Sequence, residues 1–269
     1  MPNPILDAID SLAEVGPHRW TASSRPEVMQ GRATYGGVPA GWCLRAMDAA
    51  AGAERRCRSM QLSFVGPVTA DPVEVTVDVL RSGRSATHLQ VRVVQNDEVR
   101  VTALAVYGAD RPSQVRVPAP TRPALPAPDA CLTVPYIAGV MPRMTEFVGF
   151  ALAEPRVPFS SQADADVLGH VRFPRTEATI DAGILAALVD AWWPPILPML
   201  TSPAPTSSVT WSLEFPTAPT AHRASDWFAF AGGARAAAHG YASCHGDLFA
   251  PDGTCVAISR QLVAVFDQR

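Results

Sequence analysis

The chain has 269 residues, an apolar fraction of 48% and a formal net charge of −3. This length accommodates one large domain or two smaller ones, each with its own core. All 22 cationic residues are arginine, which excludes a Schiff-base lysine and a Walker-A phosphate site. A slightly acidic chain gives no reason to expect a nucleic-acid partner, which normally requires a basic surface.

The N-terminal segment, residues 1–16, is predicted to form a short amphipathic helix with Ile5, Ile9 and Leu12 on its apolar face. It lacks the basic region of a signal peptide. The five cysteines include no Cys-x-x-Cys pair, which argues against a zinc or thioredoxin-type site. The most apolar stretch, residues 184–200, is too short and too interrupted to span a bilayer. We therefore expect a cytoplasmic protein with free thiols and no membrane association.

A first long helix is predicted from the Gly36-Gly37 pair to about residue 51, with Ala40, Cys43, Leu44 and Met47 on its buried stripe. Four strands are predicted after it, at about residues 59–65, 73–80, 88–95 and 99–107. The second of them alternates apolar and polar residues, as half-buried antiparallel strands do. Asn96-Asp97 predicts a hairpin turn between the last two.

Seven prolines lie between residues 112 and 135. Such a density is incompatible with a helix or a central strand, so this segment is predicted to be an extended linker. It divides the chain into an N-terminal unit, residues 1–111, and a C-terminal unit, residues 136–269.

The C-terminal unit is predicted to repeat the same order of elements. A helix is expected at about residues 179–192, and strands at about 207–215, 227–231, 242–249 and 255–266. Pro251-Asp252-Gly253 predicts a turn between the last two strands. One helix followed by an antiparallel meander in each half indicates an α+β layered architecture.

The two predicted helices also resemble each other in sequence. Residues 40–49 and 182–191 share Ala, Gly, Asp and Ala at equivalent positions, and each is followed by a segment that ends in Leu-x-Phe. The repeat unit, roughly 140–150 residues long, exceeds a solenoid repeat and is about the size of a domain. We therefore expect two fused copies of one fold, in which differences between the copies point to the active one.

Several motifs extend this pattern over roughly residues 22–265, apart from the proline-rich segment. They are Gly36-Gly37, Leu62-Ser63-Phe64-x-x-Pro67, Leu80–Ser85, Leu188-Val189-Asp190, Ser207–Phe215 and Gly253–Gln261. In order and spacing the chain resembles the acyl-CoA thioesterase II family and its thioesterase-like relatives. The resemblance implies an α+β double hotdog fold, in which each half wraps a curved antiparallel sheet around a central helix. It also implies an acyl-CoA substrate of fatty-acid metabolism and, because hotdog sheets associate by their edges, a homodimer.

The same resemblance implies three catalytic residues in the second half, namely Asp190, Ser208 and Gln261. Asp190 would accept a proton from a water molecule that Ser208 and Gln261 hold in place. Ser207 and Thr210 are alternatives for the hydroxyl, because a slip of one residue turns a strand side chain to the other face. Neither a covalent nucleophile, a metal nor a redox cofactor is implied.

Two further sets of residues are candidates for substrate contacts. The backbone N–H groups of Gly36 and Gly37 begin a helix and are suited to stabilise an oxyanion. In a chain without lysine, the CoA phosphates must meet backbone groups or arginine, and Arg58, Arg81 and Arg84 are either such contacts or solvated surface residues.

The first half serves as an internal control. Asp48 matches Asp190, Cys57 or Ser59 falls near the position of Ser208, and Ala105 falls near that of Gln261. The first half therefore keeps the acid and loses the amide, which predicts one working site per chain.

Other interpretations stay open from the sequence. Asp190 could be a structural acid bonded to a loop, and Trp192-Trp193 could wall an acyl pocket or pack in the core. An enoyl-CoA hydratase is disfavoured because no Asp-x-Asn-Pro-x-His motif occurs, and a serine hydrolase because no Gly-x-Ser-x-Gly elbow occurs. A non-catalytic acyl-CoA or lipid-binding protein is the remaining alternative, since the fold does not fix the function.

Overall fold

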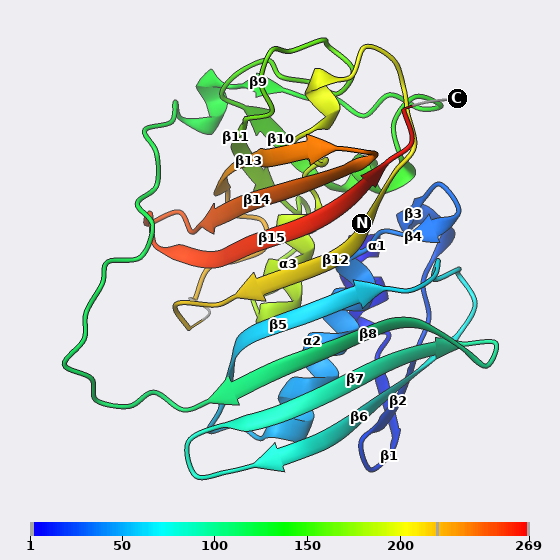
Figure 1. Ribbon diagram of the computed structural model, residues 1–269, viewed down its shortest axis with the longest axis vertical. Coiled ribbons are helices and arrows are strands. Elements are labelled where there is room, and N and C mark those ends of the chain that lie inside the picture. The colour runs from blue at the N-terminus through cyan, green and yellow to red at the C-terminus, as the bar shows by residue number, and fades with distance from the viewer. Residues whose placement is uncertain (1–2, 219–220, 268–269) are drawn as a thin grey trace.

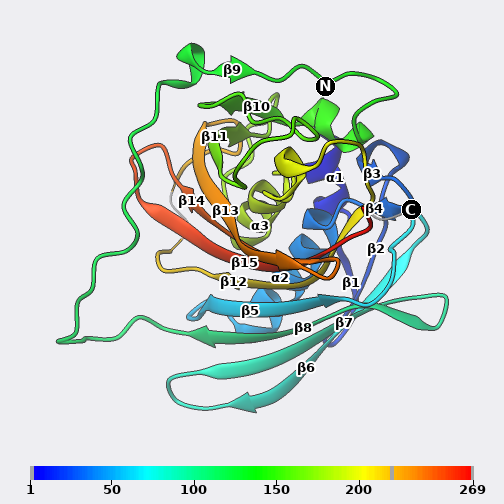
Figure 2. The same ribbon diagram turned by 45° about the horizontal axis from the view of Figure 1, so that its top comes forward.

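A computed structural model describes residues 3–218 and 221–267. In this part of the chain, 13 strands form one continuous antiparallel sheet that curves around two central helices (Figures 1 and 2). The strand order is β1-β2-β6-β7-β8-β5-β12-β15-β14-β13-β11-β10-β9. The first half thus supplies one side of the sheet and the second half the other, joined where β5 pairs with β12. This confirms the predicted α+β double hotdog.

The first half contains helices α1 (Pro4–Asp10) and α2 (Gly37–Ala51). Its long strands are β5 (Arg56–Phe64), β6 (Val73–Ser82), β7 (Thr87–Gln95) and β8 (Glu98–Gly108). Shorter elements precede α2, namely β1 (Ala13–Gly16), β2 (Arg19–Ala22), η1 (Pro26–Val28), β3 (Met29–Gln30) and β4 (Ala33–Thr34).

The second half contains helix α3 (Ala182–Asp190). Its long strands are β12 (Thr206–Glu214), β13 (Phe228–Ala238), β14 (Tyr241–Phe249) and β15 (Cys255–Val265). Its shorter elements are η2 (Pro128–Ala130), β9 (Leu132–Thr133), η3 (Arg143–Phe147), β10 (Gly149–Leu152), β11 (Val167–Arg172) and η4 (Leu197–Met199).

The helices follow the predicted pattern, with shorter ends. The first helix is confirmed with Ile5 and Ile9 fully buried, but it ends at Asp10 because β1 begins at Ala13; residues 1–2 of the prediction lie outside the described residues. The four residues predicted for the buried stripe of α2 are all buried. The helix predicted at 179–192 covers only 182–190, because Asp181 caps its start and the prolines at 194–195 prevent its continuation beyond its end. No helix in the described ranges is long and apolar enough to cross a membrane.

The two central helices cross where the glycines of the repeated Ala-Gly motif meet. A Cβ atom on Gly183 would lie 3.2 Å from the carbonyl oxygen of Gly41 and 3.3 Å from its Cα atom. The shared glycine therefore has a packing cause, because it lets the two backbones approach. The crossing also places the start of α2 beside the end of α3, which is where the site forms.

The sheet repeats even its irregularities in the two halves. A register shift lies between Cys57 and Ser59 of β5, and the equivalent shift in β12 follows Ser208. Cys57 is thus the structural counterpart of Ser208. Three residues further along, Met60 pairs with Ala105 in the first half, and Trp211 pairs with Gln261 in the second. The register therefore puts Ala105 at the position of Gln261, as predicted.

The proline-rich segment runs along the outside of the second half (Figure 1). Residues 109–127 form no helix or strand, and the carbonyl of Pro126 lies 2.9 Å from Nε2 of His170, a buried residue of β11. After residue 127 the chain forms η2 and then β9, which pairs with β10 at the edge of the sheet. The end of the segment therefore belongs to the sheet of the second half.

One predicted strand is clearly too short. The strand predicted at 227–231 continues as β13 to Ala238. Residues 232–238 consist of glycine, alanine and one arginine, which favour strands weakly. They are held in the sheet by pairing with β14 along its whole length.

Candidate active site

Two of the predicted catalytic side chains are in direct contact. Asp190 is the last residue of α3, and Gln261 lies on β15 with its side chain on the inner face of the sheet. Nε2 of Gln261 donates a hydrogen bond of 3.0 Å to Oδ1 of Asp190. The amide is thus a polar group among apolar neighbours that finds its partner on the central helix, as buried polar groups require.

The start of α2 completes this contact from the other half of the chain. The backbone N–H of Gly37 donates to the Asp190 carboxylate, and no side chain of α2 itself caps this terminus. A Cβ atom on Gly36 would lie 2.8 Å from Oδ2 of Asp190, and one on Gly37 would lie 2.7 Å from Cα of Ala187. Only glycine at both positions lets the carboxylate approach the helix terminus.

The electrostatics of Asp190 suit a proton acceptor. Burial raises the pKa of its carboxyl from 3.8 to about 7, while the bonds from Gln261 and Gly37 act in the opposite direction by stabilising the charged form. A base whose pKa lies near neutral pH is partly in its ionised form there and still binds a proton strongly enough to drive proton transfer.

Tyr35 is a residue of the site that the sequence did not indicate. It is fully buried directly before the glycine pair, and its hydroxyl donates to the backbone carbonyl of Ala187 in α3. Burial raises the pKa of this phenol well above 10, and the nearby Asp190 carboxylate adds to the shift. Tyr35 therefore stays neutral and ties the start of α2 to α3.

Ser208 lies close to this cluster but is not bonded to it. It opposes Val263 in the sheet, so Gln261 is its diagonal neighbour on the same face, typically about 7–8 Å away. Among the described residues no hydrogen bond joins the Ser208 hydroxyl to Asp190 or Gln261. Ser207 is exposed and lies on the outer face, where its hydroxyl contacts the Ser208 carbonyl at 3.4 Å.

Thr210, the other alternative for the hydroxyl, is also turned away from the cluster. It is exposed and pairs with Leu262 on the outer face of the sheet. Of the three hydroxyl candidates, only Ser208 therefore shares a face with Gln261.

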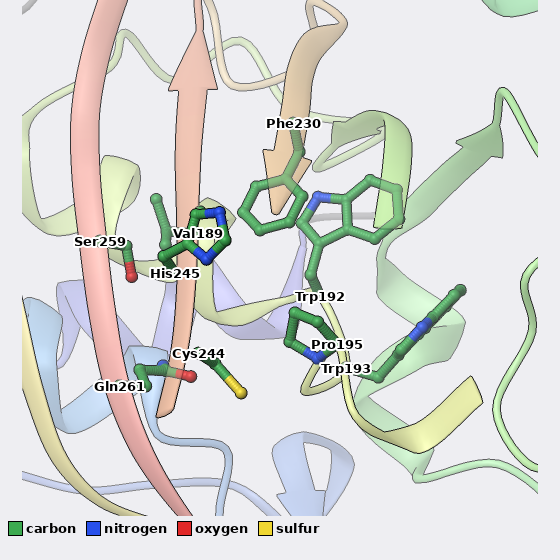
Figure 3. A pocket seen from close by; sticks show the side chains of 10 residues that line it. Val189, Trp192, Trp193, Pro195, Phe230, Cys244, His245, Ser259 and Gln261 are labelled. Carbon is green, nitrogen blue, oxygen red and sulfur yellow. The ribbon is translucent and has the colours of Figure 1, made fainter. Parts of the chain in front are cut away.

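A small cavity adjoins Gln261 on the inner side of the sheet (Figure 3). Its volume is about 10 Å³, which leaves room for no more than one water molecule. Most of the surrounding space is filled by aromatic rings: Trp192 stacks on Phe230 with 5.0 Å between ring centroids, and it meets Trp193 edge-on at 5.5 Å. The sequence left open whether Trp192 and Trp193 line a pocket or pack in the core. In the structure they line the cavity and also pack in the core.

Two family models match the chain, the acyl-CoA thioesterase N-terminal domain over residues 24–108 and the C-terminal domain over residues 128–265. The chain belongs to the acyl-CoA thioesterase family. This confirms the family predicted from the motifs. No curated protein matches the sequence.

Solved structures share the fold of this thioesterase-family chain. A hot dog fold protein of unknown function from Alicyclobacillus acidocaldarius is 24% identical with a TM-score of 0.87, and the match covers 100% of both chains. A putative thioesterase II from Thermobifida fusca is 21% identical with a TM-score of 0.81, covering 97% of each chain. The acyl-CoA thioesterase II TesB2 from Mycobacterium marinum is 18% identical with a TM-score of 0.78, covering 98% of each.

The arginines suggested as CoA contacts do not lie at this cluster. Arg55 follows the end of α2 and donates to the carbonyl of Gly83 in the β6–β7 turn, which carries Arg84, while Arg81 lies at the adjoining end of β6. Asp190 lies beside the start of α2. The end of this 15-residue helix is about 22 Å away from its start. Arg58 donates to Asp110 over 2.6 Å. The three candidates therefore belong to the opposite end of the first half of this thioesterase-family chain.

The first half holds the counterpart of Asp190 in a different setting. Burial raises the pKa of Asp48 to about 6, the neighbouring Tyr107 hydroxyl lowers it, and the Asp181 carboxylate raises it. Asp181 already caps α3, because its Oδ1 accepts the N–H of Ile184 over 2.7 Å. Arg45 holds the same carboxylate at 2.9 Å. The helix terminus that Asp48 faces is therefore occupied by another acid.

Proposed function

We propose that this chain hydrolyses acyl-CoA thioesters with a water molecule that Asp190 deprotonates. The observation that supports it most is the 3.0 Å hydrogen bond between Gln261 and Asp190, formed beside a cavity that ends at the same glutamine. A carboxyl with a pKa of about 7 is half-ionised near neutral pH, so it accepts a proton and returns it within one turnover.

The proposed reaction has two steps. Water attacks the thioester carbonyl and gives a proton to Asp190, and the C–S bond of the tetrahedral intermediate then breaks while Asp190 returns the proton to the leaving CoA sulfur. Gln261 uses its N–H to fix the carboxylate, which leaves its carbonyl oxygen free to hold the water. Ser208, on the same face, is proposed as a second contact to that water. No metal or redox cofactor enters this scheme.

The first turn of α2 is proposed to stabilise the oxyanion. The Gly37 N–H is directed at Asp190, so the Gly36 N–H and the positive end of the helix dipole are the groups proposed to face the developing charge. The proposed site would then require residues from both halves of the chain.

The test is release of the CoA thiol from a panel of acyl-CoAs by the wild type, Asp190→Asn and Asp48→Asn. We expect Asp190→Asn to lose about 10²-fold or more in kcat/KM, in line with general-base contributions. Asp48→Asn is the matched control, because it removes the equivalent carboxyl of the first half, and it should retain activity.

Two results would change the proposal. Full activity of a folded Asp190→Asn variant would rule out Asp190 as the base. Binding of acyl-CoA by the wild type without any turnover would establish the non-catalytic carrier instead.

We further propose that the chain acts in the cytoplasm, in fatty-acid metabolism, as a homodimer of double hotdogs. The dimer is proposed from the family alone, because the sheet ends at two short strands, β1 and β9, and short edge strands do not favour pairing with another chain. A mass measurement in solution that finds single chains only would contradict the dimer.

A further inference from the structure

The two halves differ at a pair of positions that face the central helices. On β7, Val91 lies two residues beyond Leu89, which pairs with Ala105 of β8. On β14, Gly246 lies two residues beyond Cys244, which pairs with Gln261 of β15. Gly246 is therefore the counterpart of Val91.

The neighbouring strand repeats this difference. Val77 of β6 pairs with Val91, and Gly232 of β13 pairs with Gly246. Two buried valines pack against α2 in the first half, whereas two glycines leave space beside α3 in the second. The counterpart of Val75, two residues before Val77, is Phe230.

Phe230 fills the space that the glycine pair leaves. A Cβ atom on Gly246 would lie 2.4 Å from Cζ of Phe230, and one on Gly232 would lie 2.7 Å from its Cε1. On its other face the ring stacks on Trp192 at an interplanar angle of 16° (Figure 3). The cavity of about 10 Å³ is what remains between this ring and Gln261.

This cavity lies on the side of the sheet where an acyl group must go. The carbonyl carbon of a substrate has to lie within reach of a water held by Asp190 and Gln261, so the acyl carbons that follow enter the space beside Gln261. A larger hollow of about 660 Å³ also touches Gln261. Because the Gln261 side chain points inward to α3, that hollow lies on the outer face, with the sheet between it and Asp190.

We propose that Phe230, held between the glycine pair and Trp192, limits the length of the acyl group that fits beside Gln261, so that the enzyme favours thioesters of short acyl groups over longer ones. The inference rests on the proposed function. The methylene groups of a longer acyl chain would collide with the Phe230 ring. A single methylene in an apolar pocket changes kcat/KM by about 10–200-fold, so longer substrates should react more slowly. Cys244 and Ser259 also line the cavity and are the side chains that a short acyl group would contact.

The test compares acetyl-, butanoyl-, hexanoyl- and octanoyl-CoA with the wild type, Phe230→Ala and Phe230→Leu. We expect the wild type to prefer the two shorter substrates. Both variants should raise kcat/KM for octanoyl-CoA by about tenfold or more, with acetyl-CoA hydrolysis changed only a few-fold. Phe230→Leu keeps an apolar core side chain and protects the test against misfolding of Phe230→Ala.

Two further variants make the test specific. Val75→Ala also removes side-chain volume, at the counterpart of Phe230 in the first half, and it should leave the chain-length profile unchanged. Gly246→Val in the Phe230→Ala background copies Val91 of the first half and should restore the short-chain limit.

The results separate this inference from the proposed function. A wild type that hydrolyses octanoyl-CoA as fast as butanoyl-CoA, or Phe230 variants with the wild-type profile, would overturn the role of Phe230 while hydrolysis itself stands. A wild type that hydrolyses none of the thioesters would overturn the proposed function.

Discussion

Asp48 lies in the last turn of α2 and Asp190 is the last residue of α3, and both have raised pKa values, of about 6 and about 7. They differ in what faces them. Asp190 meets a helix terminus that has no cap of its own and an amide that fixes its orientation, whereas Asp48 meets a terminus already capped by Asp181. A raised pKa is therefore common to both halves, and the partners of the acid distinguish the candidate active site.

The surroundings of the two acids differ in the same sense. Where the first half has Ala105 and two buried valines, the second has Gln261 and two glycines. The first half is packed with side chains that fill the space next to α2, and the second has exchanged that packing for a polar group and a cavity. The candidate active site therefore lies in the less tightly packed half.

The comparison is tested most strongly by removing the amide. Gln261→Ala copies Ala105 into the second half, and we expect kcat/KM to fall by about 10²-fold, because Asp190 is no longer held in its orientation. Steady-state kinetics of CoA release would measure it. The reverse change, Ala105→Gln, should create no second site, because Asp181 still occupies the helix terminus; doubled activity in that variant would show that the amide alone makes a site.

The shared approach of the helices is tested by Gly37→Ala. The new Cβ atom would lie 2.6 Å from the Tyr35 hydroxyl and 2.7 Å from Cα of Ala187, and overpacking of this kind destabilises by about 1–3 kcal/mol. Thermal unfolding should show a Tm lower by several degrees. Gly16→Ala is the control, because its Cβ atom has no neighbour within 4 Å; equal Tm values for the two variants would refute the tight contact.

The pH dependence sharpens the comparison of the acids. Because Asp190 must be ionised to accept a proton, kcat/KM should rise about tenfold per pH unit at acidic pH and level off above about pH 7. Gln261→Ala removes a bond to the carboxylate, so it raises the pKa of Asp190 and should move the rising limb to higher pH. Asp48→Asn should leave the acidic limb of the pH profile where it is in the wild type. A limb that shifts in the Asp48→Asn variant would show that the titrating carboxyl belongs to the first half, and it would contradict the assignment to Asp190.

The same pKa has a consequence for stability. The folded pKa of Asp190 lies above its ordinary value of 3.8, so the folded chain binds more protons at this group between about pH 4 and pH 7. The contribution of Asp190 to the free energy of unfolding is therefore largest below pH 4 and is lost as the pH rises to about 7.

The sequence was a good guide wherever the signal is local. The hairpin turn at Asn96-Asp97 is confirmed with φ values of 54° and 61°, as expected for residues that tolerate the left-handed region. Asp190 and Gln261 were named by the resemblance to the thioesterase family, and the structure brings their side chains into contact.

The rest depended on packing between distant segments. Nothing around Tyr35 indicates that its hydroxyl reaches a carbonyl 152 residues away. The sequence also does not show at which end of α2 the β6–β7 turn lies, so the distance of Arg81 and Arg84 from Asp190 could not be predicted. The role of Phe230 follows only from the pairing of Gly232 with Gly246, which no single segment reveals.

The Gly36-Gly37 terminus, donated by one half to the acid of the other, makes the fusion itself meaningful. In a symmetric dimer of single hotdogs, every substitution is made twice, so the loss of an amide would disable both sites. In a duplicated, fused chain the copies diverge independently. The first copy can give up its own chemistry and specialise as scaffold, provided that it keeps these two glycines.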